Sequence, residues 1–419
     1  MKVLHVIPSM DPITGGPCEC IRNSLPELEK LGLQNEVLCL DDPASAFIAR
    51  DPLTIHAVGP NKSPWQYSSK LSPWLEQNIT RFDVVIVHGL WLYHSYTVKK
   101  IISDYKSRLL ADQSKSARIP KVYLMPHGML DPYFQKASGR KLKALRNLAY
   151  WKLIEKDVIK KADGVLFTCE AELQLARNSF QPYKPKKEIN VGLGILAPPK
   201  ATPDMYSTFL EKCPELKNRS YILFLSRIHE KKGVDILLKA YEGVIKAKLE
   251  SPDPSPASGK TPGNLSDWPI LVVAGPGLDT PYGAYIQQIV AGSEWLRDFV
   301  IFPGMLTGDT KWGAFYGCDA FVLPSHQENF GIAVVEALAC NKPVLISNQV
   351  NIWKEIAASG GGIVASNTYS GIKGLLKSWL SLSEEEKKQM NKLAYSAYEN
   401  NFAVTPAAQK LSHAIQGHY

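Results

Sequence analysis

Short apolar runs that alternate with helix-forming segments constrain the fold of this 419-residue chain more than any other feature. Examples are residues 3–7, 82–87 and 122–125 in the first half, and 221–225, 270–274 and 320–323 in the second. A buried strand followed by a helix leads the chain back to a neighbouring parallel strand, so the pattern predicts doubly wound α/β sheets. A chain of this length exceeds the size at which one core usually splits, so we expect two domains of about 200 residues each.

Composition excludes several classes of protein. Hydrophobic residues make up 45% and charged residues 21% of the chain, which are ordinary globular values. The formal net charge of +8 fits an anionic partner, but it does not choose among sugar nucleotides, anionic lipid surfaces and nucleic acid. Charge alone is insufficient to indicate nucleic-acid binding. No window of about 18 uncharged apolar residues predicts a membrane span.

The cysteines indicate neither a metal site nor a disulfide framework. There are seven of them, an odd number, and no two have C-x-x-C spacing. We therefore expect reduced thiols in a cytoplasmic protein that is soluble, or at most peripheral at the inner face of the cell membrane.

The domain boundary is expected near Gly192-x-Gly194 and the Pro198-Pro199 pair. This gives an N-terminal domain of residues 1–197 and a second domain of residues 198–399. A segment at 250–267, rich in Pro, Ser and Gly, is typical of a surface insertion, because strand patterns of the same domain continue after it.

The stretch 324–339 has the clearest functional pattern. It follows the apolar run 320–323 and opens into a helical pattern near Gly331. A strand, a polar loop and a helix present free backbone N–H groups and a positive helix end, which favour phosphate or sugar oxygens. Glu328 and Glu336 lie eight residues apart, so their carboxylates can share a site only if Glu328 is on the loop.

This Glu328-x7-Glu336 pattern resembles the signature of retaining glycosyltransferases of family 4, which have the GT-B fold of two Rossmann-like domains facing a cleft. The resemblance implies that Glu328 contacts the donor sugar near its C3 hydroxyl and that Glu336 accepts hydrogen bonds from the ribose. It also implies that the amides of Asn329, Phe330, Gly331 and Ile332 hold sugar hydroxyls and diphosphate. The first domain would then lie on the acceptor side, the second would bind the donor, and a C-terminal helix of about 400–419 would cross back onto the first domain.

Two apolar strands end in His-Gly pairs, at His88 and His127, which places both imidazoles at one edge of a parallel sheet. The segment 126–132, Pro-His-Gly-Met-Leu-Asp-Pro, resembles bacterial exopolysaccharide transferases of family 4. That resemblance puts His127 beside the donor sugar. Gly15 and Gly16 form the loop before the first helix, and the resemblance places them near the donor phosphates. A plain tight turn is the alternative for this loop.

The second half begins with Ser226-Arg227 and, five residues on, Lys232-Gly233. These residues resemble the family element G-R-x-x-x-x-K-G, with Ser226 where glycine is usual. Arg227 and Lys232 would bind the donor diphosphate, because a guanidinium fork and a compact ammonium can neutralise a pyrophosphate without a metal. Residues at two further strand ends, Gly275 and Pro303-Gly304, complete the expected donor site. In the resembled family, the backbone at the second of these strand ends binds the nucleotide base.

The expected reaction is transfer of a sugar from a UDP- or GDP-sugar to a glycan or lipid-linked glycan in cell-surface polysaccharide or lipopolysaccharide synthesis. Negative charge that builds on the departing diphosphate must be stabilised. Arg227, Lys232 and the positive helix end are expected to stabilise it. The chain lacks an Asp-x-Asp motif, so we expect no metal, and no cofactor besides the donor.

Alternatives remain at three points. For the activity, the alternatives to a transferase are a sugar-nucleotide 2-epimerase, which shares the architecture, and a non-enzymatic nucleotide-sugar-binding protein. A dehydrogenase is disfavoured because no G-x-G-x-x-G is present. The basic amphipathic stretch 139–161 is expected to be helical and either contacts an anionic membrane or covers the sheet. The segment 61–78 is expected to be either an acceptor or membrane-facing loop or a loop with two packed tryptophans.

Overall fold

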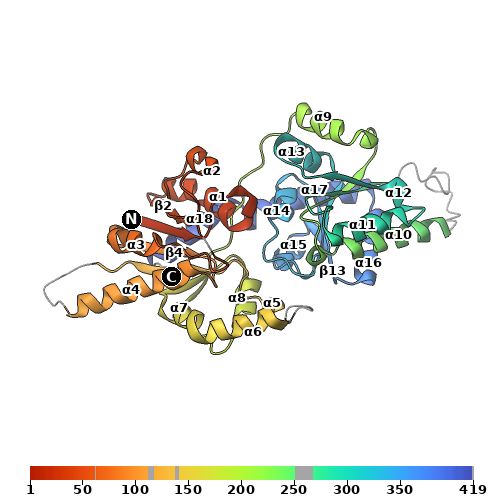
Figure 1. Cartoon of the computed structure of the whole chain (residues 1–419). Coiled ribbons are helices and arrows are strands. Elements are labelled where there is room, and N and C mark those ends of the chain that lie inside the picture. Colours follow the sequence, from red (N-terminus) through yellow and green to blue (C-terminus); the bar gives the residue numbers. More distant parts are fainter. Residues whose placement is uncertain (62, 112–117, 137–140, 251–267, 418–419) are drawn as a thin grey trace. The chain divides into compact units, whose positions relative to one another are not determined.

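The computed structural model describes residues 1–61, 63–111, 118–136, 141–250 and 268–417, so the insertion expected at 250–267 falls almost entirely outside the described residues. The chain forms two compact units (Figure 1). Unit 1 comprises residues 1–196 and 403–419, and unit 2 comprises residues 197–402. The chain passes between them at Leu196/Ala197 and at Phe402/Ala403.

Unit 1 contains a seven-stranded parallel sheet in the order β3-β2-β1-β4-β5-β6-β7. Its strands are β1 (Lys2–Ile7), β2 (Gln34–Cys39), β3 (Ile55–Ala57), β4 (Val84–His88), β5 (Lys121–Met125), β6 (Gly164–Phe167) and β7 (Glu188–Asn190). Its helices include α1 (Gly16–Lys30), α2 (Ala46–Arg50), α3 (Leu71–Asn78), α4 (Tyr93–Ala111), α5 (Tyr133–Lys136), α6 (Lys141–Tyr150), α7 (Lys156–Lys161), α8 (Glu170–Arg177) and α18 (Val404–Gln416).

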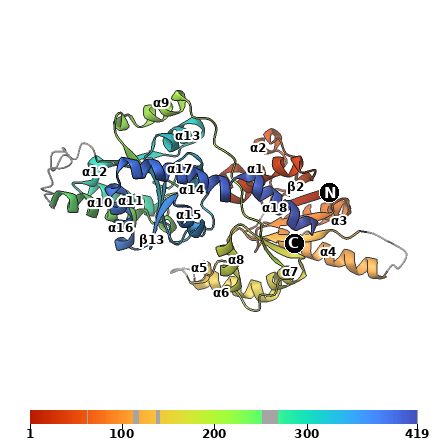
Figure 2. The same ribbon diagram turned by 180° about the vertical axis from the view of Figure 1, so that it is seen from behind.

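Alternation of side chains along the strands gives this sheet two buried faces. On one face Leu4, Val87 and Leu124 pack in a core with residues of α3, α4 and α7. The other face carries His5 and Tyr123, and the Tyr123 hydroxyl donates to the carbonyl of Ala414 in α18. Helix α18 lies beside α1 in both views (Figures 1 and 2), so the C-terminal helix completes unit 1.

Unit 2 contains a six-stranded parallel sheet in the order β10-β9-β8-β11-β12-β13. Its strands are β8 (Tyr221–Leu225), β9 (Ile270–Ala274), β10 (Val300–Gly304), β11 (Ala320–Leu323), β12 (Val344–Ser347) and β13 (Gly362–Ala365). Its helices are α9 (Pro203–Lys212), α10 (Val234–Glu250), α11 (Pro281–Ala291), α12 (Leu296–Phe299), α13 (Gly308–Gly317), α14 (Ile332–Ala339), α15 (Trp353–Ser359), α16 (Tyr369–Ser381) and α17 (Glu384–Asn401).

Both sheets are doubly wound, as the alternation of strands and helices predicts, and the fold class is GT-B. In unit 1 the strand order reverses between β1 and β4, and in unit 2 between β8 and β11. Loops leaving two adjacent strands at such a reversal diverge to opposite faces, which leaves room for a ligand at the carboxyl edge. The sequence-predicted site residues of each unit are found at these edges.

Two local expectations are met only in part. The stretch expected to be helical at 139–161 is helical from Lys141 to Lys161, with residues 139–140 outside the described residues. A π-helical turn at Trp151–Glu155 separates α6 from α7, and its Trp151 and Glu155 side chains are buried. The segment 61–78 is not a loop throughout, since its last eight residues form α3. Its tryptophans are packed: Trp65 donates from Nε1 to the Tyr150 hydroxyl at 2.7 Å, and Trp74 contacts His56.

Candidate active site

The loops after β8 and β11 contact each other at the strand reversal of unit 2. Gly233 adopts φ 69°, and a Cβ there would collide with the carbonyl of Pro324. The backbone N–H of His326 donates to the carbonyl of Lys231 at 2.8 Å. Glycine is required at this close approach, because any side chain would separate the two loops. The contact brings Lys232 to Glu328.

Lys232 and Glu328 form an ion pair, Nζ to Oε2, and their side chains are only 11% and 18% exposed. Glu328 lies on the loop, where its N–H donates to the carbonyl of Gln349 at 2.9 Å and its carbonyl accepts from Asn351 N–H at 3.0 Å. These two bonds fix the loop after β11 to the loop after β12. The carboxylate therefore has a defined position and a cation beside it before any ligand binds.

Glu336, inside α14, has a lysine partner that sequence reasoning missed. The Nζ of Lys311, in α13, lies 2.6 Å from Glu336 Oε1, and the same ammonium lies 4.6 Å from the centre of the Trp312 ring. Each carboxylate of the Glu328-x7-Glu336 pair is thus paired with a lysine. Each pairing offsets the negative charge of its carboxylate, Glu328 on the loop and Glu336 in α14.

The amino end of α14 is open for hydrogen bonding. Gly331 precedes the helix with φ 83°, and Val334 is the first residue of this turn whose N–H bonds a carbonyl, that of Gly331 at 2.9 Å. The N–H groups of the first helical turn have no partner within a helix, so they can bind an anion or a hydroxyl. Phe330 is buried and packs edge-on against Phe402, which anchors the turn.

The remaining donor-side candidates lie along the same edge of unit 2. Gly275, at φ 137°, donates its N–H to the carbonyl of Gly304 at 2.8 Å, and Pro303 and Gly304 end β10. Arg227 lies two residues after the end of β8 and is exposed, and within the described part of the chain its guanidinium has no hydrogen-bond or ion-pair partner. The structure therefore brings Lys232 and Glu328 into contact, while Arg227 stands apart from that pair.

In unit 1, three histidines from the adjacent strands β1 and β4 and from the loop after β5 form a hydrogen-bonded chain. His5 Nδ1 lies 3.0 Å from His88 Nε2, and His88 Nδ1 lies 3.0 Å from His127 Nε2. Their rings stack with centroids 5.2 Å and 5.3 Å apart. His127 lies two residues after the end of β5 at φ 52°, which turns it back toward His88. The sequence placed His88 and His127 at one edge; it did not indicate that His5 would join them.

Asn35 sets the donor-to-acceptor direction of the hydrogen bonds that join the three histidines. Its amide nitrogen donates to the carbonyl of Leu33 at 3.2 Å, so its Oδ1 faces His5 Nε2 at 3.3 Å and must accept a proton from it. A neutral His5 then accepts at Nδ1 from His88, and a neutral His88 accepts at Nδ1 from His127. His127 consequently carries its proton on Nε2 and a lone pair on Nδ1, which can accept a hydrogen bond from a sugar hydroxyl.

Burial keeps these imidazoles neutral. Loss of solvent around the ring lowers the pKa of His127 to about 4, even though part of that residue remains accessible. Burial likewise lowers the pKa of His5 to about 4, with the hydrogen bond to Asn35 opposing the shift. The pKa of His88 is lowered well below its usual value by burial and, second, by the neighbouring imidazoles.

Glu172 holds the loop that carries His127, and nothing in the sequence pattern singled it out. This buried carboxylate accepts from the backbone N–H of Gly128 through Oε1, and from the N–H and hydroxyl of Thr168 through Oε2, at 2.8 Å and 2.6 Å. The residue belongs to α8, so it ties the loop after β5 to the loop after β6.

Replacing Glu172 with glutamine is expected to destabilise the protein by about 1–3 kcal/mol, because an amide NH₂ group must then face a buried donor. Thermal unfolding measures the effect. Glu170→Gln, on the exposed first turn of the same helix, is the matched control and should leave the midpoint nearly unchanged. Equal midpoints for the two variants would contradict this role of Glu172.

Gly15 and Gly16 lie at the start of α1 on the β1 side of the strand reversal. Gly15 is the N-cap at φ 73°, and a Cβ on either glycine would meet no atom within 4 Å. The positive φ of Gly15 requires glycine, whereas the open space around both residues leaves the backbone accessible.

Most of the second unit matches a known protein family. Residues 208–399 match the family described as "Glycosyl transferases group 1". Over 219 residues the chain is 26% identical to the D-inositol 3-phosphate glycosyltransferase of Salinispora arenicola. The aligned region covers 51% of this chain and 43% of that protein. The chain spans less than half the length of the curated relatives it matches.

Solved structures with the same fold cover the whole chain. Anabaena Alr3699/HepE, determined in complex with UDP and glucose, aligns over 100% of both chains with a TM-score of 0.68 and 15% identity. WaaG, a glycosyltransferase involved in lipopolysaccharide biosynthesis, aligns over 100% of both chains with a TM-score of 0.65 and 14% identity. Residues 208–399 thus match the group 1 glycosyl transferases, within a chain of GT-B fold.

The described residues show neither a metal-binding cluster nor a membrane-spanning helix. Within the described ranges, no cluster of three or more His, Cys, Asp or Glu side chains is arranged to hold a metal ion. None of the helices in those ranges combines the length and the apolar character needed to span a membrane.

Proposed function

We propose that the protein is a retaining glycosyltransferase of family 4 that transfers a sugar from a UDP- or GDP-sugar to a glycan or lipid-linked glycan. The observation that carries the proposal is the pairing of each carboxylate in Glu328-x7-Glu336 with a lysine at the open amino end of α14. The group 1 match over residues 208–399 supports a nucleotide-sugar donor for this unit.

The chemistry follows from these groups. The bond between the sugar C1 and the diphosphate oxygen breaks, and its electron pair moves onto the leaving phosphate. Lys232, Arg227 and the amides of Asn329 to Ile332 stabilise that charge. The acceptor oxygen bonds C1 on the face that the phosphate leaves, its proton passes to the phosphate, and the anomeric configuration is retained. His127 accepts a hydroxyl proton of the sugar in a hydrogen bond and orients the ring. No step requires a metal.

The cellular setting is part of the proposal. The segment 126–132 resembles exopolysaccharide transferases, which favours synthesis of cell-surface polysaccharide or lipopolysaccharide in the cytoplasm, at the inner face of the membrane. Helix α6 supports peripheral contact, because Leu142 and Leu145 are 85% and 65% exposed on a helix that also carries Lys143 and Arg146. An exposed apolar stripe flanked by cations suits an anionic membrane surface.

The donor is tested by thermal unfolding with a panel of UDP-, GDP- and ADP-sugars, and with NAD, each with and without EDTA. A ligand at 100 times its dissociation constant adds about 2.7 kcal/mol of stability. We expect a shift with one sugar nucleotide that is lost in Arg227→Ala and in Glu336→Ala. A shift with NAD alone, or one that EDTA abolishes, would refute the proposed metal-independent site.

Product analysis separates the transferase from a sugar-nucleotide 2-epimerase of the same architecture. With donor but no acceptor, a transferase leaves the sugar unchanged on its nucleotide, whereas an epimerase converts it. Conversion of the donor in the absence of acceptor would replace the proposed activity.

A further inference from the structure

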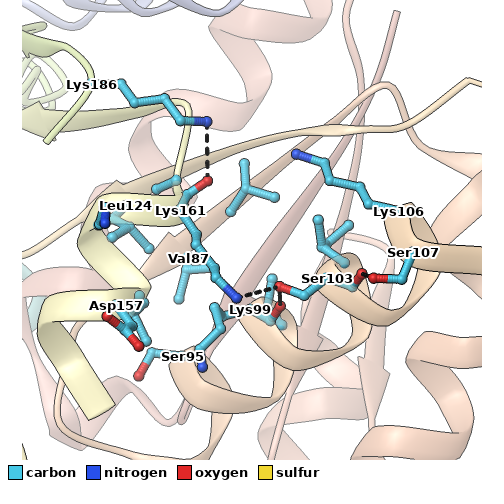
Figure 3. Close-up of a pocket in the computed structure, with 16 residues that line it drawn as sticks. Val87, Ser95, Lys99, Ser103, Lys106, Ser107, Leu124, Asp157, Lys161 and Lys186 are labelled. Atoms are coloured by element: carbon cyan, nitrogen blue, oxygen red, sulfur yellow. Dashed lines mark hydrogen bonds between the residues drawn. The ribbon is translucent and has the colours of Figure 1, made fainter. Parts of the chain in front are cut away.

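Unit 1 contains a second cavity on the sheet face opposite to the histidine chain. It lies between α4, α7 and the strands β4 and β5, and its volume is ≈ 510 Å³ (Figure 3). Ligand pockets commonly occupy about 300–1,000 Å³. Val87 and Leu124 lie at its floor as almost fully buried members of the core, and they point away from the face that carries His5, because side chains alternate along a strand.

The walls of this cavity are apolar in the interior and cationic around the rim. The aliphatic residues are Val87, Val98, Ile102, Val122, Leu124 and Val158. Five lysines line it, Lys99 and Lys106 from α4, Lys160 and Lys161 from α7, and Lys186 from the segment before β7. Asp157 is the one acidic lining residue, so the cavity has a marked excess of positive charge.

Most of these ammonium groups have no carboxylate partner. Among the described residues, Lys186 is the one lysine of the five with an ion pair, to Asp163 at 3.0 Å. Lys161 Nζ donates to the hydroxyl of Ser103 at 3.4 Å, and Lys99 lies over the Tyr96 ring at 5.3 Å. Figure 3 shows Lys106 and Lys186 directed over the cavity from different elements.

Helix-end electrostatics explain only part of this arrangement. Lys160 and Lys161 are in the last turn of α7, where a cation interacts favourably with the helix dipole. Lys99 and Lys106 lie before the last turn of α4, so the dipole gives no reason for them to face the same cavity. Like charges gathered from three segments repel one another, and a bound anion would relieve that repulsion.

We propose that this cavity binds an anionic amphiphile, with a phosphate group on the lysine rim and a hydrocarbon chain on the aliphatic floor. A small hydrophilic anion would leave the floor unused, and a neutral lipid would leave the lysines unneutralised. The same chemistry is present in a phospholipid of a membrane and in a free phosphorylated lipid. The inference is independent of sugar transfer, because it rests on different residues and on the other face of the sheet.

The test uses the full-length protein and isothermal titration with dihexanoyl phosphatidic acid below its micelle concentration. Inorganic phosphate and dihexanoyl phosphatidylcholine serve as the comparison ligands. We expect saturable one-site binding of the phosphatidic acid, and affinities at least about tenfold weaker for the other two. No saturable binding of phosphatidic acid would overturn the proposal. Equal affinity for inorganic phosphate would overturn the role of the aliphatic floor.

Matched lysine variants locate the site. Lys106→Gln/Lys160→Gln removes two rim charges, and Lys100→Gln/Lys152→Gln removes two exposed charges from the same part of unit 1 that do not line the cavity. We expect the first pair to weaken phosphatidic acid binding at least about tenfold, and the second to leave it within about twofold. Equal loss in both pairs would show general charge attraction and overturn the site.

Two further arms complete the experiment. Ser103→Phe places a ring in the cavity without changing charge, and it should abolish binding while circular dichroism stays unchanged; retained binding would contradict a ligand at this position. Sedimentation with phosphatidylcholine vesicles, with and without phosphatidylglycerol, identifies the source. Binding to anionic vesicles that the rim variant loses indicates a membrane lipid, whereas binding of the monomer alone indicates a free lipid.

Discussion

Replacing Lys232 with methionine is expected to lower kcat/KM for sugar transfer by about 10²–10³-fold, the usual effect of removing one preorganised group that stabilises a leaving oxyanion. The Lys232 side chain is 11% exposed and contacts Glu328, so its charge acts in a site with little solvent screening. The loss should appear mainly in kcat if the ammonium acts on the departing phosphate rather than on donor binding. Steady-state kinetics with the donor found by thermal unfolding measure this effect.

Two further variants separate catalysis from stability. Lys231→Met, at the neighbouring lysine, should keep kcat/KM within about threefold, since its backbone carbonyl rather than its side chain holds His326. Lys232→Met/Glu328→Gln removes the carboxylate that the single change leaves unpaired, so it should regain stability without regaining activity. Full activity in folded Lys232→Met would exclude this lysine from the reaction.

The free energy of unfolding is expected to be greatest near about pH 7. It should fall steeply below about pH 6.5, because the buried histidines take up protons when the protein unfolds. His5, His94 and His127 have pKa values lowered to about 4 by burial, and the pKa of His88 is also well below its usual value. Between pH 6.5 and 4 the unfolded chain therefore binds protons that the folded chain excludes. Each such histidine removes about 1.4 kcal/mol of stability per pH unit.

Glu155 acts in the opposite direction at higher pH. Burial raises its pKa to about 8, so the folded protein keeps a proton that the unfolded chain releases above about pH 4.5. Stability should fall as pH rises from 7 to 8. Urea midpoints measured across pH 4.5–8.5 test both sides. His5→Gln should flatten the acid side and Glu155→Gln the alkaline side; unchanged slopes in both variants would refute the linkage.

Residues 320–339 show how much a local pattern can determine. The apolar run, the glycine at 331 and the apolar helix after it predict a strand, a loop and a helix, and the structure has β11, the Gly331 N-cap and α14 at those positions. Local steric and capping preferences fix these features, because each depends on residues a few positions apart. The same holds for the strand ends at His88 and His127.

The stretch 139–161 shows where local pattern was not enough. Its amphipathic periodicity predicts one helix, but burying Trp151 and Glu155 in unit 1 inserts a π-helical turn. Packing against distant residues outweighed the regular helical period. The packing of Trp65 and Trp74 in segment 61–78 likewise depends on residues far away in the chain.

The sequence by itself determined the class of fold, two doubly wound sheets, and the loops at which chemistry is expected. Only the tertiary structure decided the partners: Lys311 beside Glu336, Asn35 and His5 behind His127, and Glu172 beneath Gly128. The bonded pairs among these residues are 25 to 83 positions apart in sequence. Periodicity and capping act within a few residues, whereas such pairs form only when parallel strands bring remote loops to one edge of a sheet.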